Sequence, residues 1–146
     1  MKYRLTSQTI EHAGVTLHRI ECIESFKGVN VGERGGFVEK ESNLSQTCNA
    51  WVYDKAKVYG DAEVCGDAEV YGDAWVYGKK DYIVFKNSWS SGRYFTWTRS
   101  NDKWRVGCFY GSGEVLIKKA YSDSEESGRH YELYVQLVER LKKLDK

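Results

Sequence analysis

The sequence contains no proline, a single methionine and only three histidines among 146 residues. It also lacks any apolar run long enough to cross a bilayer, and its first residues lack the charged and apolar blocks of a signal peptide. We therefore do not expect an integral membrane protein of the helical type or a secreted protein with a cleaved leader. We therefore expect a cytoplasmic protein that has no membrane partner.

Residues of the types that bind metals or catalyse reactions are few, and their spacing does not match that of such sites. The four cysteines form no CxxC pair, and no histidine stands at zinc-ligand spacing from them. We expect them to be reduced, small core residues: Cys22, Cys48, Cys65 and Cys108. No serine or cysteine stands in a nucleophile elbow, and no glycine-rich loop opens a helix to hold phosphate. The sequence therefore predicts a protein that is not an enzyme and that has no cofactor and no bound metal.

One segment repeats itself every six residues, from Ala50 to Gly78. A small residue and a β-branched residue alternate with outward positions in each repeat, as in a short strand. These apolar positions are Ala50, Ala56, Ala62, Ala68 and Ala74, and Val52, Val58, Val64, Val70 and Val76. Glycines such as Gly60 supply tight corners between the strands. A fixed short period indicates that each repeat buries its apolar positions by stacking on its neighbours.

The repeats resemble the hexapeptide-repeat, left-handed parallel β-helix family, in which three hexads make one coil. The resemblance implies that residues about 18 apart stack, which would place Tyr53 over Tyr71, Tyr59 over Tyr77, and Trp51 beside Glu69. The phase extends back to Val38 and gives seven hexads up to Lys79, a little over two coils. Such a short stack needs caps at its ends or a second subunit.

The patterns in the segments before and after the repeats predict such caps. Tyr3–Leu5 and Val15–Ile23 read as a hairpin, and residues 81–87, 93–100 and 103–110 read as a three-stranded antiparallel meander. Apolar residues then recur at helical spacing, at Tyr134, Leu137, Val138, Leu141 and Leu144. A shorter helix or a fourth strand begins near Gly113. We thus predict a mainly β chain: a hairpin-capped, short left-handed parallel β-helix in residues 1–79, and a small α+β domain in residues 80–146.

The net charge of +1 conceals two lobes of opposite sign. Residues 33–78 carry four bases against nine acids, whereas residues 79–119 carry nine bases against three acids. Aromatic residues lie among the bases, as a stacking platform for single-stranded nucleic acid or nucleotides would require. This predicted basic-aromatic lobe comprises Arg93, Tyr94, Trp97, Arg99, Lys103, Trp104 and Arg105. The alternative is that the aromatic residues pack beneath a helix and the bases form a solvated outer face.

Two further surfaces are candidates for contacts. The acidic lobe offers a polyanionic alternative at Glu63, Asp67, Glu69 and Asp73. The outward aromatic residues of the repeats exceed what an isolated monomer usually exposes, so we expect the C-terminal domain or a second subunit to cover some of them. They are Trp51, Tyr53, Tyr59, Tyr71, Trp75 and Tyr77. Between these arrangements we favour a homodimer.

The whole chain also resembles a group of uncharacterised phage and prophage proteins. The resemblance rests on the YRLT and TLHRIE hairpin, the segment GGFVEKESNLS, the hexads AxVYGx, and a strand like WxVGCFxG at Trp104 to Gly111. It implies an interaction protein that inhibits a bacterial macromolecule, our specific expectation being a defence effector such as a CRISPR nuclease. The partner would then be a host protein or ribonucleoprotein in the cytoplasm of an infected cell. Two alternatives stay open: a protein that sequesters a cyclic nucleotide signal, and a remnant acyltransferase.

Overall fold

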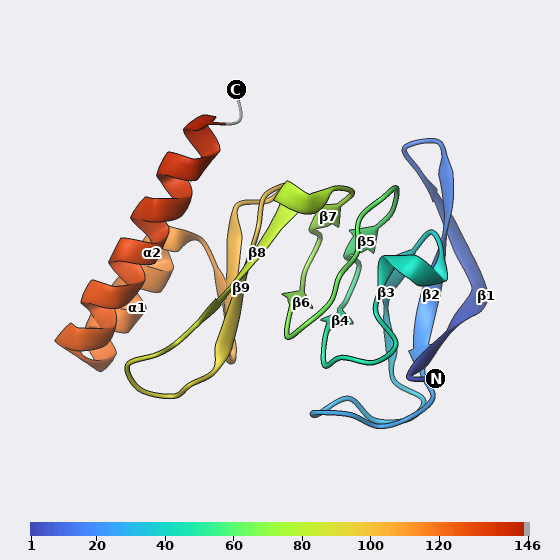
Figure 1. Ribbon diagram of the computed structural model, residues 1–146, viewed down its shortest axis with the longest axis horizontal. Coiled ribbons are helices and arrows are strands. Elements are labelled where there is room, and N and C mark those ends of the chain that lie inside the picture. The colour runs from blue at the N-terminus through green and yellow to red at the C-terminus, as the bar shows by residue number, and fades with distance from the viewer. Residues whose placement is uncertain (145–146) are drawn as a thin grey trace.

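The computed structural model describes residues 1–144, and Figure 1 shows three blocks arranged side by side along the longest axis. A β-hairpin of β1 (Tyr3–His12) and β2 (Val15–Cys22) lies at one end. The six-residue repeats occupy the middle. A four-stranded sheet covered by α1 (Gly113–Asp123) and α2 (Glu125–Leu144) forms the other end.

The fold of residues 1–144 is mixed α/β, with eleven strands in three sheets and two α-helices. The predicted mainly β fold built on a parallel β-helix is therefore wrong. Strand β2 pairs antiparallel with β3 (Arg34–Val38), which in turn pairs parallel with β5 (Lys57–Val58), and β5 pairs parallel with β7 (Trp75–Val76). The largest sheet is thus a mixed one. Each parallel pair spans only two residues, whereas the longest strands of the chain are antiparallel.

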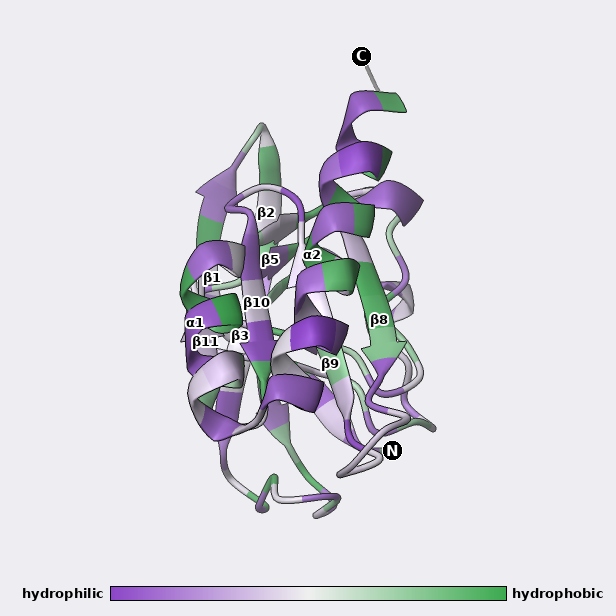
Figure 2. Cartoon of the chain, turned by 90° about the vertical axis from the view of Figure 1, so that its left-hand side faces the viewer, coloured by the Kyte–Doolittle hydropathy of each residue, from purple (hydrophilic) through white to green (hydrophobic). Residues whose placement is uncertain are grey.

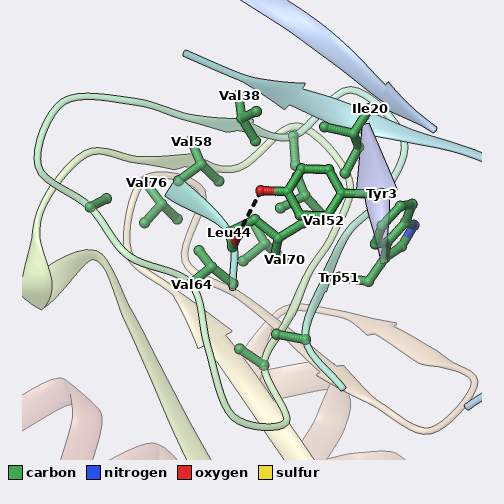
Figure 3. Close-up of a cluster of buried hydrophobic side chains, with 14 of the residues drawn as sticks. Tyr3, Ile20, Val38, Leu44, Trp51, Val52, Val58, Val64, Val70 and Val76 are labelled. Atoms are coloured by element: carbon green, nitrogen blue, oxygen red, sulfur yellow. Dashed lines mark hydrogen bonds between the residues drawn. The ribbon is translucent and has the colours of Figure 1, made fainter. Parts of the chain in front are cut away.

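The repeats nevertheless stack at the predicted distance of 18 residues. Lys57 pairs with Trp75 in the mixed sheet, and β4 (Trp51–Val52) pairs with β6 (Glu69–Val70) in a two-stranded sheet. The rings of Tyr53 and Tyr71 lie 5.0 Å apart, and those of Tyr59 and Tyr77 lie 5.6 Å apart. All five alanines and all five valines of the repeats are buried. Figure 3 shows the valines converging on one core.

Residues near the N-terminus close one end of this core. The Tyr3 ring enters among the valines in Figure 3, and its hydroxyl donates to the carbonyl oxygen of Leu44 at 2.6 Å. The Lys2 ammonium donates to the carbonyl oxygen of Ala50 at 2.7 Å. Burial lowers the pKa of Lys2 and raises the pKa of Tyr3. Both polar groups are tolerated there because backbone carbonyls satisfy them.

The second large sheet has the order β11–β10–β9–β8. Its strands are β8 (Tyr82–Lys86), β9 (Tyr94–Thr98), β10 (Lys103–Val106) and β11 (Phe109–Gly111). The predicted strands at 81–87 and 93–100 are present as β8 and β9. The predicted strand 103–110 is divided, because the chain turns at Gly107 and Cys108 and returns as β11. The predicted short helix near Gly113 is also present as α1, and the Ser112 side chain caps it by accepting from the amide of Val115. The chain therefore forms strand β11 first and helix α1 directly after it.

This sheet lies between the helices and the repeats. Figure 2 shows α1 and α2 crossing its outer face, where Phe95, Trp97 and Trp104 are buried in the core with both helices. The opposite face contacts the repeats: the hydroxyl of Thr96 accepts from the amide of Glu69 at 3.0 Å. The sheet thus closes the second end of the repeat core.

The four cysteines do not form a set of core residues. Cys22 is buried, but Cys65 and Cys108 are exposed, and none of the four is in a disulfide. The prediction of small core residues fails for these two. Cys65 fails because it occupies the outward position that tyrosine holds in neighbouring repeats.

Candidate functional site

Outward side chains of the repeats form a row across the mixed sheet. Val58 and Val76 point into the core, so the residues that precede them, Lys57 and Trp75, point outward. Phe37 extends the same row through its pairing with Lys57. Its ring is covered by Arg19, whose guanidinium lies 4.5 Å from the ring centroid. The row is therefore open to solvent at Trp75, which is 45% exposed.

Aromatic rings collect around this open end. Tyr77, two residues after Trp75 and 56% exposed, stacks on Tyr59 with an interplanar angle of 23°. The imidazole of His12, at the end of β1, lies 4.8 Å from the Trp75 ring and 5.2 Å from the Tyr59 ring. These four rings and the ammonium group of Lys57 are called the aromatic surface below. It joins the tip of the N-terminal hairpin to the last repeat.

The backbone beneath the aromatic surface is held by side chains from the following segment. The amide of Trp75 donates to the Ser100 hydroxyl at 2.7 Å. The amides of Tyr77 and Gly78 both donate to one carboxylate oxygen of the buried Asp81 at 2.9 Å. Since these bonds hold the backbone of residues 75–78 in place, little backbone freedom is lost there when a partner binds.

The local electrostatics keep the aromatic surface uncharged apart from Lys57. Burial lowers the pKa of His12, and the nearby positive charge of Lys57 lowers it further. Burial also raises the pKa of Tyr59, with smaller contributions from Tyr77 and Asp81. Both rings are thus neutral near pH 7. A neutral aromatic patch with one cation suits recognition of a partner surface by burial and cation–π contact.

The predicted basic-aromatic lobe is not brought together as one exposed face. Trp97 and Trp104 are directly paired across β9 and β10 and lie in the core beneath the helices. Their burial agrees with the alternative given by the sequence pattern. Lys103 is half-buried at the start of β10. No stacking platform for nucleic acid is formed by these two indoles.

Two of the predicted arginines are used within the chain. Arg105 places its guanidinium 4.1 Å from the ring centroid of Tyr71 and 3.5 Å from a carboxylate oxygen of Glu69. Arg99 donates to the carbonyl oxygen of Lys80 at 2.9 Å. Both therefore fasten the C-terminal sheet to neighbouring segments, and the expected solvated outer face does not include them.

The remaining pair, Arg93 and Tyr94, lines a cleft of about 230 Å³ between the sheet and the helices. Lys119 of α1 and Tyr131 of α2 line it too. Sequence reasoning missed these two because they lie 26 and 37 residues further along the chain from Arg93 and Tyr94 respectively. The cleft offers cations and aromatic rings to a small anionic ligand.

Two residues of the acidic alternative pair with cations of the same chain. Asp67 lies 3.5 Å from the Lys27 ammonium, Glu69 contacts Arg105, and Asp73 accepts from the side-chain amide of Asn101 at 3.0 Å. Glu63 is exposed. The ion pairs of Asp67 and Glu69 therefore interrupt the acidic face between Glu63 and Asp73.

The predicted oligomer or domain contacts divide into two groups. Trp51 is buried against the rings of Tyr3 and Phe26, and Tyr71 packs on Tyr110 of the C-terminal sheet. Tyr53 packs on Tyr71 in turn. Of these six residues, Trp75 and Tyr77, which belong to the aromatic surface, are exposed, and Tyr53, Tyr59 and Tyr71 are half-buried. His12 could not be found from the sequence, because its position depends on how the hairpin folds over the sheet.

No family model matches the chain, and no curated protein matches it at a significant level of similarity. Within residues 1–144, no helix combines the length and apolar character that a bilayer crossing needs. Nor does that part of the chain bring three or more histidine, cysteine, aspartate or glutamate side chains together in a way that could hold a metal ion.

Proposed function

We propose that this protein is a binding protein that occupies a site on a bacterial macromolecule through the aromatic surface and inhibits it. The resemblance to phage and prophage proteins supports a defence effector, such as a CRISPR nuclease, as the target. It also supports the cytoplasm of an infected or lysogenic bacterium as the place of action. The partner is then a host protein or ribonucleoprotein.

The observation that carries the proposal is the exposure of Trp75 and Tyr77 on a strand whose backbone is held in place. Tryptophan and tyrosine are the residues most often responsible for binding energy at protein interfaces. Large apolar side chains that gather on a surface mark interaction sites, whereas isolated ones do not. The half-buried Lys57 beside them favours a partner with acidic groups around an apolar centre.

The proposal predicts that Trp75→Ala combined with Tyr77→Ala abolishes partner capture. Each truncation of such an anchor costs about 2–4 kcal/mol of binding free energy, so affinity should fall more than about 100-fold. Immobilised wild-type protein and the double variant are exposed to the same bacterial lysate, and the bound proteins are quantified by mass spectrometry. Tyr94→Ala is the matched control, since it removes another aromatic side chain that is 40% exposed.

The double variant should lose only a few degrees of melting temperature, because both side chains are largely outside the core. A protein captured by the wild type and by Tyr94→Ala, but not by the double variant, supports the proposal. Equal capture by all three proteins excludes the aromatic surface as the binding site.

The cleft at Arg93 favours nucleotide binding as the second candidate function. A ligand that binds only the folded state raises the melting temperature in proportion to the logarithm of its concentration. This function predicts that cyclic mononucleotides or dinucleotides raise the melting temperature of the wild type, and that Arg93→Glu removes the effect. An unchanged melting temperature at millimolar ligand would eliminate this candidate and leave the first one standing.

A further inference from the structure

The cleft at Arg93 continues into a second cavity. The cleft has a volume of about 230 Å³, and the second cavity has a volume of about 180 Å³. Lys119 and Tyr131 line both of them, as do Val106 and Phe109. The two are therefore parts of one space, called the groove below. It lies between the two helices and residues 87–93, which connect β8 to β9.

A buried hydroxyl group faces the groove. Tyr131, which lines both cavities, is only 7% exposed. Its oxygen accepts from the side-chain amide of Asn87 at 3.4 Å, and burial raises the pKa of Tyr131, so the hydroxyl keeps its proton near pH 7. Within residues 1–144 this proton has no acceptor. Because buried donors are normally hydrogen-bonded, an acceptor that enters the groove would satisfy it.

The connection between β8 and β9 supplies two more donors. The oxygen of Ser91 accepts from the amide of Arg93 at 3.2 Å, and its hydroxyl donates to no group in the described part of the chain. Arg93 is exposed, and its side chain has no ion pair there either. The guanidinium lies beside Gly107 of the cleft, since a Cβ atom at that glycine would be 3.5 Å from it. A hydroxyl and a cation thus border the cleft side of the groove.

Helix α1 supplies a second cation, Lys119. Its ammonium lies 3.3 Å from a carboxylate oxygen of Asp123, and both side chains are more than half exposed. An exposed ion pair of this kind contributes little to stability, and an ammonium has two further protons to donate. An anion in the groove can therefore bind Lys119 without separating the pair.

These four donors match a terminal phosphate group. A phosphate monoester presents three terminal oxygens and close to two negative charges near pH 7. A carboxylate or a cyclic phosphodiester presents two such oxygens and one charge, so it would leave donors of the groove unsatisfied. Arginine and lysine are side chains that commonly bind phosphate. The donor set therefore favours a phosphate monoester.

The second cavity limits the rest of the ligand. Leu116 and Ala120 line this cavity alone and are buried, so they give it an apolar wall. Asp123 also lines it, and its carboxylate disfavours a second phosphate there. Sites for small molecules are usually about 300–1,000 Å³, and even both cavities together lie near the lower end of that range. The groove therefore fits one molecule of mononucleotide size.

We propose that the groove binds a nucleoside 5′-monophosphate. The phosphate is held by Arg93, Lys119 and the Tyr131 hydroxyl, and the nucleoside packs against Leu116 and Ala120. This inference rests on ligand binding at the cleft, the second candidate function, but it changes the ligand from a cyclic signal to a phosphate monoester. The aromatic surface takes no part in it.

The test is isothermal titration calorimetry with ribonucleoside 5′-monophosphates, their 3′,5′-cyclic forms, cyclic dinucleotides and unphosphorylated nucleosides. At least one 5′-monophosphate should bind the wild type at least about tenfold more tightly than its cyclic form and its nucleoside. Arg93→Gln and Lys119→Gln should each weaken that binding at least about fivefold, because each removes a charge from the phosphate site. Both residues are exposed, so these variants should fold as the wild type does.

Tyr131→Phe tests the buried donor. It should weaken binding of the 5′-monophosphate at least about tenfold, since a hydrogen bond to a charged group is lost. It keeps the ring that packs on Phe95, and near-ultraviolet circular dichroism checks that this packing is retained. Tyr121→Phe and Arg140→Gln are the matched controls, because they remove a hydroxyl and a charge at exposed positions outside the groove. Both should bind as the wild type does.

The outcomes separate this inference from the second candidate function. If cyclic nucleotides bind at least as tightly as the 5′-monophosphates and Arg93→Gln removes that binding, the inference is overturned and the second candidate function stands. If no ligand binds at millimolar concentration, both are overturned. Binding of a 5′-monophosphate that is unchanged in Arg93→Gln and Lys119→Gln, or that the controls weaken equally, also overturns the inference.

Discussion

Replacing Val64 with aspartate is expected to abolish cooperative folding. Val64 is fully buried and forms a parallel bridge with Leu44, at the centre of the stacked repeats. Its surroundings are other valines and alanines, which offer no partner to a carboxylate. An uncompensated buried charge costs about 4–5 kcal/mol or more, which is comparable with the whole stability of many domains.

The measurement is thermal unfolding followed by circular dichroism, with Cys65→Asp as the matched control. Cys65 is the next residue along the chain and is exposed, so the same side chain there remains hydrated. We expect a sigmoidal transition for the wild type and for Cys65→Asp, and none for Val64→Asp. A soluble Val64→Asp protein with the wild-type melting curve would contradict the inward assignment of the valines.

Reversing the charge of Arg105 is expected to destabilise the protein. Its side chain is 19% exposed, lies over the Tyr71 ring and pairs with Glu69. Arg105→Glu would remove the cation–π contact and place two carboxylates together, at a cost of about 2 kcal/mol. For a chain of this length the melting temperature should fall by about 4–8 °C. Sequence analysis had placed Arg105 in a basic-aromatic lobe, or else on a solvated outer face.

Arg93→Glu provides the comparison for Arg105→Glu, because Arg93 is exposed. Its melting temperature should stay within about 2 °C of the wild-type value. If both variants melt at the wild-type temperature, Arg105 does not fasten the C-terminal sheet to the repeats.

The stacking of the repeats could be predicted because it is encoded locally. A period of six residues indicates which side chains point inward. The 18-residue distance between Trp51 and Glu69 came from the resemblance to repeats in which three hexads make one coil. What the period does not encode is which strands join the edges of the stack. The antiparallel pairing of β2 with β3 makes the largest sheet mixed, and for this reason the predicted fold class fails.

The candidate site was less predictable for the same reason. The repeat phase placed Trp51 and Trp75 in equivalent outward positions. Yet Trp51 is covered by Tyr3 and Phe26 from the N-terminal segment, whereas Trp75 is open. His12 reaches Trp75 through the path of the hairpin. Burial of an outward residue depends on contacts between distant segments, which a local period cannot specify.

The central claim is that Trp75 and Tyr77 bind and inhibit a bacterial target. Its most direct test is the plating efficiency of a phage on bacteria that carry the captured defence effector. Expression of the wild type should raise plating to the level seen on bacteria lacking the effector, whereas an equal amount of the Trp75→Ala, Tyr77→Ala protein should not. Full protection of the phage by the double variant, or none by the wild type, would contradict the claim.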